Sequence, residues 1–372
     1  MRFTLFTSSL QAGGAERSVS VLAEALASRG HAVTVVTWNS NAPDFYSLSE
    51  AVKRERVSFS RQSLSVKWYN IPGNLRRLRL IRKVITATAP DTAISFLDGS
   101  NELLLMATAG LPFTKLVSCQ NNIFIRSHHN RRWEHLRRRA YRLADRVVFL
   151  DHGLAERVQR FEPRWRCAAI PNPLVPVDTV ADEAAAGVIK EIEPFRFCIA
   201  AMGRLVHQKG FDLLLEAFRL VSEKVPDTGL VILGEGPLRG DLQTKCRELG
   251  LEDRVSLPGV VRKPHAVIAH TTLFAFSSRF EGQGMALAEA MACGVPVIAF
   301  DCPVGPRHMV EATDGGLIVP AEDVDALAAS IIRLLTDAEL RSEYARKALR
   351  ITDELSPSKI AGEWEVLATR CQ

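Results

Sequence analysis

Short continuous runs of apolar residues alternate with segments of helical periodicity along the first 170 residues. The run at 2–9 predicts a buried strand, a glycine-containing loop follows at 11–17, and apolar residues then recur at helical spacing from 19 to 26. A second apolar run at 31–37 completes a β-α-β unit. The alternation predicts a parallel sheet flanked by helices, with a phosphate-sized loop after its first strand.

Prolines interrupt this alternation near residue 170. Three of them fall within the stretch PNPLVPVD, and an Ala- and Glu-rich segment follows it. Such a break is typical of a linker between domains. We expect an N-terminal domain at 1–172 that is completed by a C-terminal helix at 356–372, a linker at 173–194, and a second domain at 195–355.

The second half repeats the strand–helix alternation, beginning with a strand-like run at 197–202. The last residues, 357–369, carry Ile360, Trp364 and Leu367 at helical spacing, which predicts an amphipathic helix. The chain therefore belongs to the α/β class with two doubly wound sheets. Further strands are predicted at 92–97, 115–118, 146–150, 230–233, 255–257, 273–276 and 295–300.

Composition is that of an ordinary globular enzyme, with 47% hydrophobic and 24% charged residues among 372. No apolar run is long enough to span a membrane, and the first ten residues are too short and polar for a signal peptide. The seven cysteines are scattered and form no C-x-x-C pair. This usage favours reduced thiols in a cytoplasm.

Charge is distributed unevenly along the chain. Residues 1–170 hold 26 of the 47 Lys and Arg but only 13 of the 42 Asp and Glu. Basic amphipathic segments favour an anionic membrane surface, and a solvated helix face is the alternative that stays open. No nucleic-acid-binding module is recognised, so nucleic acid is not expected as a partner. The charge gathers in two helix-like segments: Arg76, Arg77, Arg79, Arg82 and Lys83, and Arg126, Arg131, Arg132, Arg137, Arg138, Arg139, Arg142 and Arg146.

Two carboxylates, Glu281 and Glu289, stand with seven residues between them across the predicted start of a helix near Met285. Gly282 and Gly284 let the backbone approach a ligand closely. The free N–H groups of a helix start suit a phosphate, and carboxylates suit sugar hydroxyls. The alternative is that Glu281 caps the helix and Glu289 is a solvated surface residue.

A second motif follows the strand at 197–202. Arg204 and Lys209 stand five apart on a loop before a helix. A forked guanidinium and a point-charge ammonium suit a diphosphate, whereas the simpler interpretation is two surface cations.

Both motifs resemble those of retaining glycosyltransferases of family 4, which have the GT-B fold. The resemblance covers EGQGMALAEAMACGVPVIAFDCPVGP, which contains the E-x7-E signature, and GRLVHQKGFDLLLEAF. It implies two Rossmann-like domains facing a central cleft, with the terminal helix crossing back onto the first domain. It also implies transfer of a sugar from a nucleotide diphosphate, UDP in our expectation, to an acceptor hydroxyl.

The resemblance assigns roles by position. Glu281 is expected to hold hexose hydroxyls, Glu289 the ribose, and Arg204 with Lys209 the pyrophosphate, so that Glu281, Arg204 and Lys209 are the expected catalytic residues. On the acceptor side we expect Gly13, Glu16, Gln120 and Asn121. The expected donor-binding residues are Gly14, Gly203, Gly236, Val261, Gly282, Gln283, Gly284, Met285, Ala286 and Glu289.

Two positions depart from the family pattern. Gln283 stands where relatives usually carry an apolar or aromatic residue beside the hexose. The end of the middle strand of the first domain lacks the histidine of many relatives, and Gln120 or Asn121 is expected to take its place as a neutral donor. Asp323 and Asp325 begin a helix and are not expected to bind metal.

Together these features predict an enzyme that moves a hexose or N-acetylhexosamine from a UDP-sugar to a saccharide acceptor. The FDCPVGPR segment resembles enzymes of bacterial lipid-linked glycan and polysaccharide synthesis, so a lipid-linked acceptor is expected. We expect no cofactor or metal, and a peripheral location on the inner face of the cytoplasmic membrane. The alternatives are an inactive sugar-nucleotide-binding subunit and a GT-B sugar-nucleotide epimerase.

Overall fold

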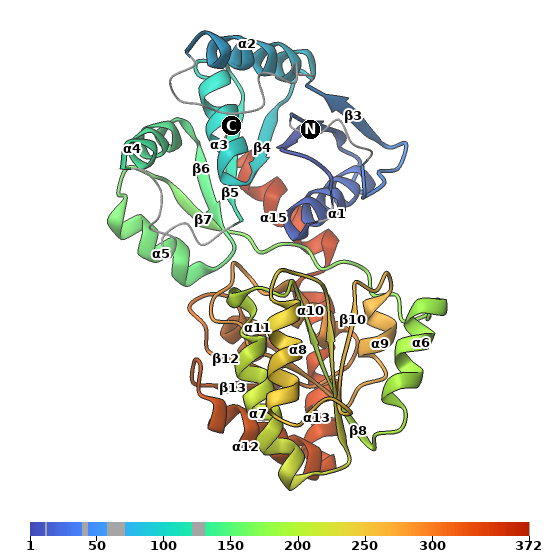
Figure 1. Cartoon of the computed structure of the whole chain (residues 1–372). Helices are drawn as coiled ribbons and strands as arrows, with labels where there is room; N and C mark the ends of the chain where they lie inside the picture. The colour runs from blue at the N-terminus through green and yellow to red at the C-terminus, as the bar shows by residue number, and fades with distance from the viewer. Residues whose placement is uncertain (12, 39–43, 58–70, 121–130, 372) are drawn as a thin grey trace. The chain divides into compact units, whose positions relative to one another are not determined.

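The structure is a computed structural model that describes residues 1–11, 13–38, 44–57, 71–120 and 131–371. The chain folds into two compact units, each with its own sheet (Figure 1). Unit 1 comprises Met1–Val175 with Leu355–Gln372, and unit 2 comprises Pro176–Glu354. None of the described helices is both long and apolar enough to cross a bilayer.

Unit 1 contains a seven-stranded parallel sheet in the order β3-β2-β1-β4-β5-β6-β7. Both faces of this sheet are covered, because successive residues of its first strand belong to different cores. Leu5 packs in the cluster of α1 and α15, and Phe6 packs in the cluster of α2 and α3. The strands are β1 (Arg2–Thr7), β2 (Ala32–Thr37), β3 (Val52–Arg56), β4 (Thr92–Phe96), β5 (Thr114–Cys119), β6 (Arg146–Phe149) and β7 (Cys167–Ala169). The helices are α1 (Gly14–Ser28), α2 (Ile71–Ala87), α3 (Asp98–Ala107), α4 (Arg131–Ala140), α5 (His152–Phe161) and α15 (Pro357–Thr369), with a 3-10 turn at Tyr141–Leu143.

Unit 2 contains a six-stranded parallel sheet in the order β10-β9-β8-β11-β12-β13. Its core joins alternate residues of β8 and β9 to the apolar faces of α7 and α12. The strands are β8 (Phe197–Met202), β9 (Thr228–Leu233), β10 (Val255–Gly259), β11 (Leu273–Phe276), β12 (Val297–Phe300) and β13 (Gly316–Val319). The helices are α6 (Glu183–Ile192), α7 (Phe211–Lys224), α8 (Arg239–Glu248), α9 (Pro264–Ile268), α10 (Met285–Ala292), α11 (Pro306–Thr313), α12 (Val324–Thr336), α13 (Ala338–Ala348) and α14 (Ile351–Glu354), with a 3-10 turn at His207–Lys209.

The structure differs from the sequence-based expectation in the segment assigned to a linker. Residues 183–192 form helix α6, which Asp182 caps by accepting a hydrogen bond from the Ala185 N–H at 2.9 Å. The apolar residues Val188, Ile189 and Ile192 are buried. This helix belongs to unit 2, so the extended part of the crossover is limited to the proline-containing stretch before it.

The C-terminal helix α15 belongs to unit 1, as the family resemblance implies. Ile360 and Trp364 are buried in the core beside α1, and the Trp364 ring lies 6.1 Å from the ring of Phe96 on β4. At its solvent edge, Glu365 forms ion pairs with Arg29 and His31. The hydrogen bond from Arg29 is the largest cause that lowers the Glu365 pKa to about 2.

Replacing Trp364 tests the contribution of α15 to unit 1. We expect Trp364→Ala to lower the free energy of unfolding by about 3–5 kcal/mol, because it opens a cavity under a sheet face. Val366 lies on the same helix but is 52% exposed. The control Val366→Ala should change stability by no more than about 0.5 kcal/mol. Urea unfolding followed by circular dichroism measures both; equal shifts would contradict the packing described above.

Candidate functional site

The order of strands in unit 2 reverses between β8 and β11, and this reversal defines where its ligand site is expected. In doubly wound sheets, ligands bind outside the carboxyl ends of the strands at such a switch point. The loops that leave these two strands are residues 203–210 and 277–284. They carry the two motifs singled out in the sequence, so the topology brings both motifs to one edge of the sheet.

Backbone contacts join the two loops. The Arg279 N–H donates to the Gln208 carbonyl at 2.8 Å, and the Ser277 hydroxyl donates to the Lys209 carbonyl at 2.9 Å. Gly210 allows this approach: its φ is +60°, and a Cβ there would lie 2.1 Å from the Ser277 carbonyl oxygen. A larger residue at this position would separate the loops.

Arg279 clamps the same two loops through its side chain, a role that the sequence analysis did not identify. Its guanidinium donates to both carboxylate oxygens of Asp212, at 2.8 and 2.7 Å, and to the His207 carbonyl at 2.9 Å. A second ion pair joins it to Glu322 at 3.0 Å. The hydrogen bond to Asp212 is the largest cause that raises the Arg279 pKa. A forked cation bound to one loop carbonyl and two carboxylates fixes the geometry of both loops.

Lys209 and Glu281, two of the expected catalytic residues, form a direct ion pair across the switch point. Lys209 Nζ lies 2.6 Å from Glu281 Oε1, and the Ser278 hydroxyl donates to the same oxygen at 2.7 Å. Glu281 is buried. Gly203 makes room for the lysine, since a Cβ at that position would lie 3.0 Å from Lys209 Cε. The carboxylate is therefore held in one orientation before any ligand arrives.

Helix α10 begins at this edge with Gly284 as its N-cap, in the left-handed conformation at φ +90°. No side chain caps the helix, and Met285 and Ala286 in its first turn are half-buried. The N–H groups of a first helical turn have no acceptor within the helix, so they can bind an anion. Gln283 is buried, and Gly305 packs against its backbone.

Glu289 lies on the buried side of α10, which rules out the alternative of a solvated surface residue. Its Oε2 is 2.9 Å from Nε2 of His265 on α9. Both side chains are almost fully enclosed, at 7% and 5% exposure. The sequence analysis missed His265, although a histidine between Pro264 and the apolar run AVI is a signal of a buried polar contact.

Three other expected site residues belong to unit 2 and differ in how closely they are packed. Arg204 is exposed, and its side chain bonds to no residue in the described part of the chain. Val261 is half-buried between β10 and α9. Gly236 packs against Leu205, where a Cβ would lie 2.4 Å from the carbonyl oxygen, so the turn after β9 supports the Arg204 loop.

The glycine pair of unit 1 lies at the start of α1, after β1. The Glu16 carboxylate folds back over the helix start. It lies so close to Gly13 that a Cβ there would be 2.2 Å from Glu16 Oε2. Around Gly14 there is open space for a side chain. This loop follows β1, on one side of the switch point between β1 and β4. Leu97, whose backbone is strained at φ +73°, follows β4 on the other side.

The expectation that Gln120 offers a free donor is corrected by its contacts. Its Nε2 donates to the Ser118 hydroxyl at 2.8 Å and to Asn172 Oδ1 at 3.0 Å, and its Oε1 accepts from Asn172 Nδ2 at 2.7 Å. Both amide hydrogens are thus already used. Gln120 thus connects the end of β5 to Asn172, which follows β7. Asn121 lies outside the described residues.

Two of the arginines expected on a basic surface are buried. Arg77 on α2 is 3% exposed and Arg137 on α4 is 6% exposed. Arg137 lies near Glu102 of α3, whose two carboxylate oxygens are buried without a hydrogen-bond partner. Burial is the largest cause, followed by the charge of Asp98, that raises the pKa of Glu102 to about 8. Arg126 lies outside the described residues.

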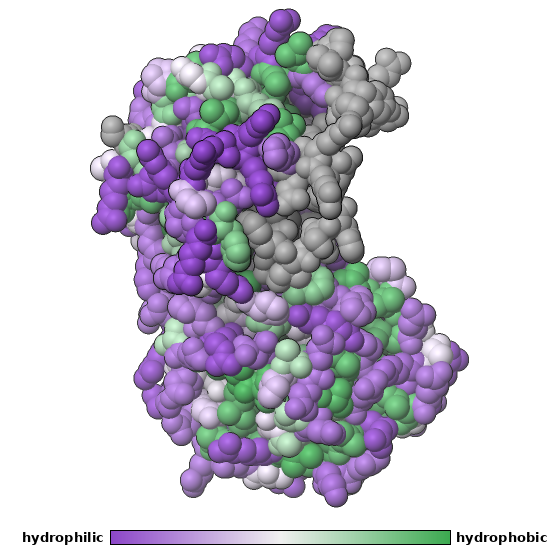
Figure 2. Space-filling view, turned by 90° about the vertical axis from the view of Figure 1, so that its left-hand side faces the viewer, coloured by the Kyte–Doolittle hydropathy of each residue, from purple (hydrophilic) through white to green (hydrophobic). Residues whose placement is uncertain are grey.

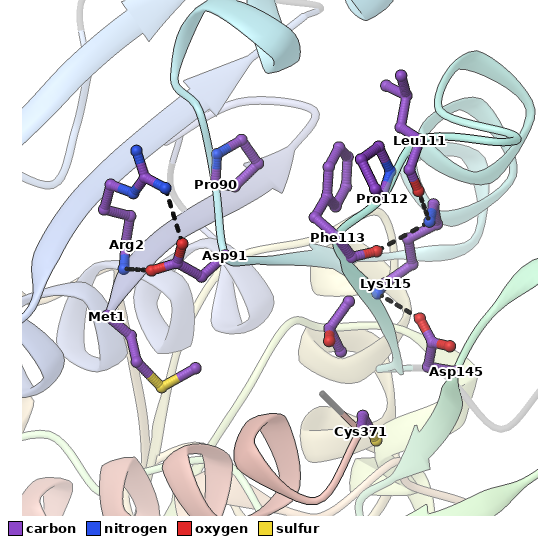
Figure 3. Close-up of a pocket in the computed structure, with 11 residues that line it drawn as sticks. Met1, Arg2, Pro90, Asp91, Leu111, Pro112, Phe113, Lys115, Asp145 and Cys371 are labelled. Carbon is purple, nitrogen blue, oxygen red and sulfur yellow. Dashed lines mark hydrogen bonds and ion pairs between the residues drawn. The ribbon is translucent and has the colours of Figure 1, made fainter.

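A cavity of about 640 Å³ opens at the opposite edge of the first sheet (Figure 3). Its lining includes Arg2, Asp91 and Lys115 at the amino ends of β1, β4 and β5. Their polar groups are satisfied locally: Arg2 pairs with Asp91 at 2.8 Å, and Lys115 Nζ donates to the Leu111 carbonyl at 2.8 Å. The cavity is therefore away from the carboxyl ends of the strands, where the site is expected.

The remaining acidic pair, Asp323 and Asp325, lies at the start of α12. Asp323 caps this helix by accepting from the Ala326 N–H at 2.9 Å, as the sequence predicts. In the part of the chain that the structure covers, no three His, Cys, Asp or Glu side chains are grouped to hold a metal ion. All seven cysteines are free thiols.

Two known family models match the chain. Residues 189–350 match the family model described as glycosyl transferases group 1, and residues 13–173 match the glycosyl transferase 4-like domain. The chain is a glycosyltransferase, and its two matched domains are consistent with family 4. It is therefore a transferase with the GT-B fold, and one match falls in each of the two units described above.

Named relatives span nearly the whole chain. One is the N-acetylgalactosamine-N,N'-diacetylbacillosaminyl-diphospho-undecaprenol 4-alpha-N-acetylgalactosaminyltransferase of Campylobacter jejuni. It is 27% identical over 365 residues, which cover 96% of each chain. An uncharacterized glycosyltransferase of Haemophilus influenzae is 26% identical over 95% of this chain and 96% of its own.

Solved structures confirm the fold of this glycosyltransferase. Sucrose-phosphate synthase of Thermosynechococcus elongatus superposes with a TM-score of 0.82 at 20% identity, covering 100% of this chain and 99% of its own. HepE of Anabaena, in complex with UDP and glucose, gives 0.75 at 18% identity, covering 99% of this chain and 100% of its own. At these identities the likeness concerns the fold alone.

The buried carboxyl of Glu102 predicts an unusual pH dependence of stability. Between its ordinary pKa of 4.5 and its folded value of about 8, the folded state keeps a proton that the unfolded state releases. The stability from the protonated form is complete below pH 4.5 and is lost as the pH rises through 8. We expect the free energy of unfolding of the wild type to fall between pH 5 and pH 9. Glu102→Gln should remove this loss, which is at most on the order of 5 kcal/mol.

Urea unfolding at both pH values measures this difference. The exposed Glu156 of α5 serves as the control, since Glu156→Gln removes a carboxylate that is already solvated. A change in wild-type stability from pH 5 to pH 9 that Glu102→Gln leaves unaltered would contradict the prediction.

Proposed function

We propose that the enzyme transfers a hexose or N-acetylhexosamine from a UDP-sugar to a hydroxyl of a lipid-linked saccharide, with retention of configuration. The observation that carries this proposal is the Lys209–Glu281 ion pair at the switch point of unit 2, next to the uncapped start of α10. The pair places a cation, a fixed carboxylate and free N–H groups at one edge, and these are the groups that a nucleotide sugar requires.

The chemistry follows from where charge develops. As the glycosidic bond breaks, negative charge grows on the leaving diphosphate. Lys209, the exposed Arg204 and the first turn of α10 are preplaced to stabilise it. Glu281 accepts from Lys209 and Ser278 through one oxygen, so its other oxygen can accept from a hexose hydroxyl. In this proposal the protein's own cations balance the diphosphate, and no metal is required.

The acceptor is proposed from the relatives. The name of the C. jejuni relative specifies a diphospho-undecaprenol acceptor and an alpha linkage. The resemblance of the FDCPVGPR segment to lipid-linked glycan enzymes points in the same direction. The UDP in the HepE complex supports the choice of nucleotide.

A transfer assay tests the function. Purified enzyme is given labelled UDP-glucose, UDP-galactose, UDP-GlcNAc or UDP-GalNAc with a bacterial lipid extract, and a labelled lipid product is expected with one of them. Labelled free sugar nucleotide of changed configuration would show an epimerase instead. Binding of every donor without turnover would show an inactive subunit.

Two substitutions should separate catalysis from nucleotide binding. We expect Arg204→Ala to lower kcat by about 10²–10³, because it removes a donor to the leaving diphosphate. Glu289→Ala should weaken UDP binding about 10- to 100-fold, the usual effect of losing hydrogen bonds to a charged group. Arg247→Ala, at an exposed position of α8, is the control. Steady-state kinetics and calorimetry with UDP measure both effects; identical profiles for the two variants would refute the assigned roles.

We also propose that unit 1 binds an anionic membrane surface through α4, the following 3-10 turn and α5. Exposed arginines there include Arg139, Arg142 and Arg160, beside the exposed apolar side chains of Leu143 and Phe161. An ion pair between Arg138 and Glu162, at 3.0 Å, brings the end of α5 next to α4. Figure 2 looks onto this side of the molecule and shows hydrophilic residues gathered over unit 1 with apolar ones among them.

Vesicle sedimentation tests this surface. Each arginine near an anionic surface contributes about 1 kcal/mol, so changing Arg139, Arg142 and Arg160 to Glu should lower binding to phosphatidylglycerol vesicles at least about 100-fold. The wild type should bind neutral phosphatidylcholine vesicles more weakly than phosphatidylglycerol vesicles. Raised salt should weaken its binding to phosphatidylglycerol vesicles. The matched control changes three exposed basic residues of unit 2 (Arg247, Arg262 and Arg346) to Glu. Equal loss in both triple variants would reject the α4–α5 surface.

A further inference from the structure

The buried contact between His265 and Glu289 extends the donor site by one residue. His265 is the second residue of α9, and Glu289 lies one turn into α10. Side chains of a helix lean toward its N-terminus, so the Glu289 carboxylate reaches back toward the switch-point edge. Its contact with His265 at 2.9 Å is enclosed on all sides, unlike the ion pairs of the protein surface.

The hydrogen bonds around His265 determine its tautomer. The backbone N–H of Asp178 donates to Nδ1 of the imidazole at 3.4 Å, so Nδ1 acts as the acceptor. The ring proton of a neutral histidine must then be on Nε2, where it donates to Glu289 Oε2. This donor at Nε2 orients the Glu289 carboxylate.

Two further groups near the pair, an ion pair and a thiol, have partners of their own. Lys263 forms an ion pair with the Asp178 carboxylate at 3.0 Å, so the residue that orients His265 is itself fixed. The Cys293 thiol lies over the His265 carbonyl at 3.7 Å, and burial, followed by the charge of Glu289, raises its pKa to about 12. Cys293 therefore stays neutral beside Glu289.

We propose that His265 is a positioning residue that orients Glu289 to accept hydrogen bonds from the ribose diol of the donor nucleotide. This inference rests on the proposed function. A buried carboxylate is stable only when good donors surround it, and two ribose hydroxyls supply donors that a deoxynucleotide lacks. The pair thus makes the site selective for ribonucleotides, and His265 contributes to that selectivity without touching the ligand.

The test compares UDP with 2′,3′-dideoxy-UDP by calorimetry, because the ratio of their dissociation constants isolates the diol. For the wild type we expect a ratio of at least about 10, the usual effect of two hydrogen bonds to a buried charge. His265→Phe keeps a ring of similar shape but removes the donor, so the ratio should fall to about 1–3 while binding of dideoxy-UDP changes less than about threefold.

Two further variants keep the result interpretable if His265→Phe does not fold. The amide nitrogen of His265→Gln can reach the position of Nε2, so it should keep most of the ratio. His265→Asn is shorter, reaches only the position of Nδ1, and should lose the ratio as His265→Phe does. Melting temperatures of all variants confirm folding.

Each outcome decides between distinct possibilities. A ratio that falls in the Phe and Asn variants and survives in Gln supports the inference. Equal weakening of both nucleotides in every variant shows a packing role and overturns it. A wild-type ratio near 1 also overturns it, because Glu289 then does not hold the diol. Absence of UDP binding by the wild type rejects the proposed function itself, which is a different result from the preceding ones.

Discussion

The ion pair between Lys209 and Glu281 is the contact on which the site in unit 2 depends. It joins two loops that are 72 residues apart in sequence and leave neighbouring strands. Both side chains are largely removed from water, so breaking the pair by losing either partner would leave an uncompensated buried charge. The backbone bonds between the loops and the Arg279 clamp hold the pair in register, so that ligand binding meets an arrangement already formed.

The two units treat buried charge differently. In unit 2, Glu281 and Glu289 each have a donor at hydrogen-bond distance, from Lys209 and from His265. In unit 1, Glu102 is equally buried but has no such donor, and its raised pKa is the consequence. Burying a carboxylate is costly unless a donor is at hydrogen-bond distance, whereas a carboxyl that stays protonated needs no such partner. Pairing thus distinguishes the two carboxylates to which we assign the sugar nucleotide from the buried carboxyl of unit 1.

The sequence was sufficient for the parts of the fold that apolar patterns encode. It predicted the strands on both sides of each switch point because they are buried on both faces and therefore continuously apolar. It missed β3, whose sequence VKRER is charged, since an edge strand has one neighbour and faces water. It missed the short strands β7 and β13 for lack of an apolar run of sufficient length. Contacts such as Gln120 with Asn172, 52 residues apart, depend on the assembled fold and no local pattern contains them.

The spacing of the two carboxylates has a physical origin in the turn between them. Glu281 precedes α10 and is fixed by the loop after β11, whereas Glu289 lies more than one helical turn inside α10. A rise of about 1.5 Å per residue carries Glu289 into the interior, and the backward lean of its side chain returns the carboxylate toward the helix start. Gly284, in a left-handed conformation, lets the chain turn between them without covering the first N–H groups. In the proposed function, one loop and one helix start recognise sugar hydroxyls, diphosphate and ribose, while Lys209 and His265 keep the two carboxylates in place.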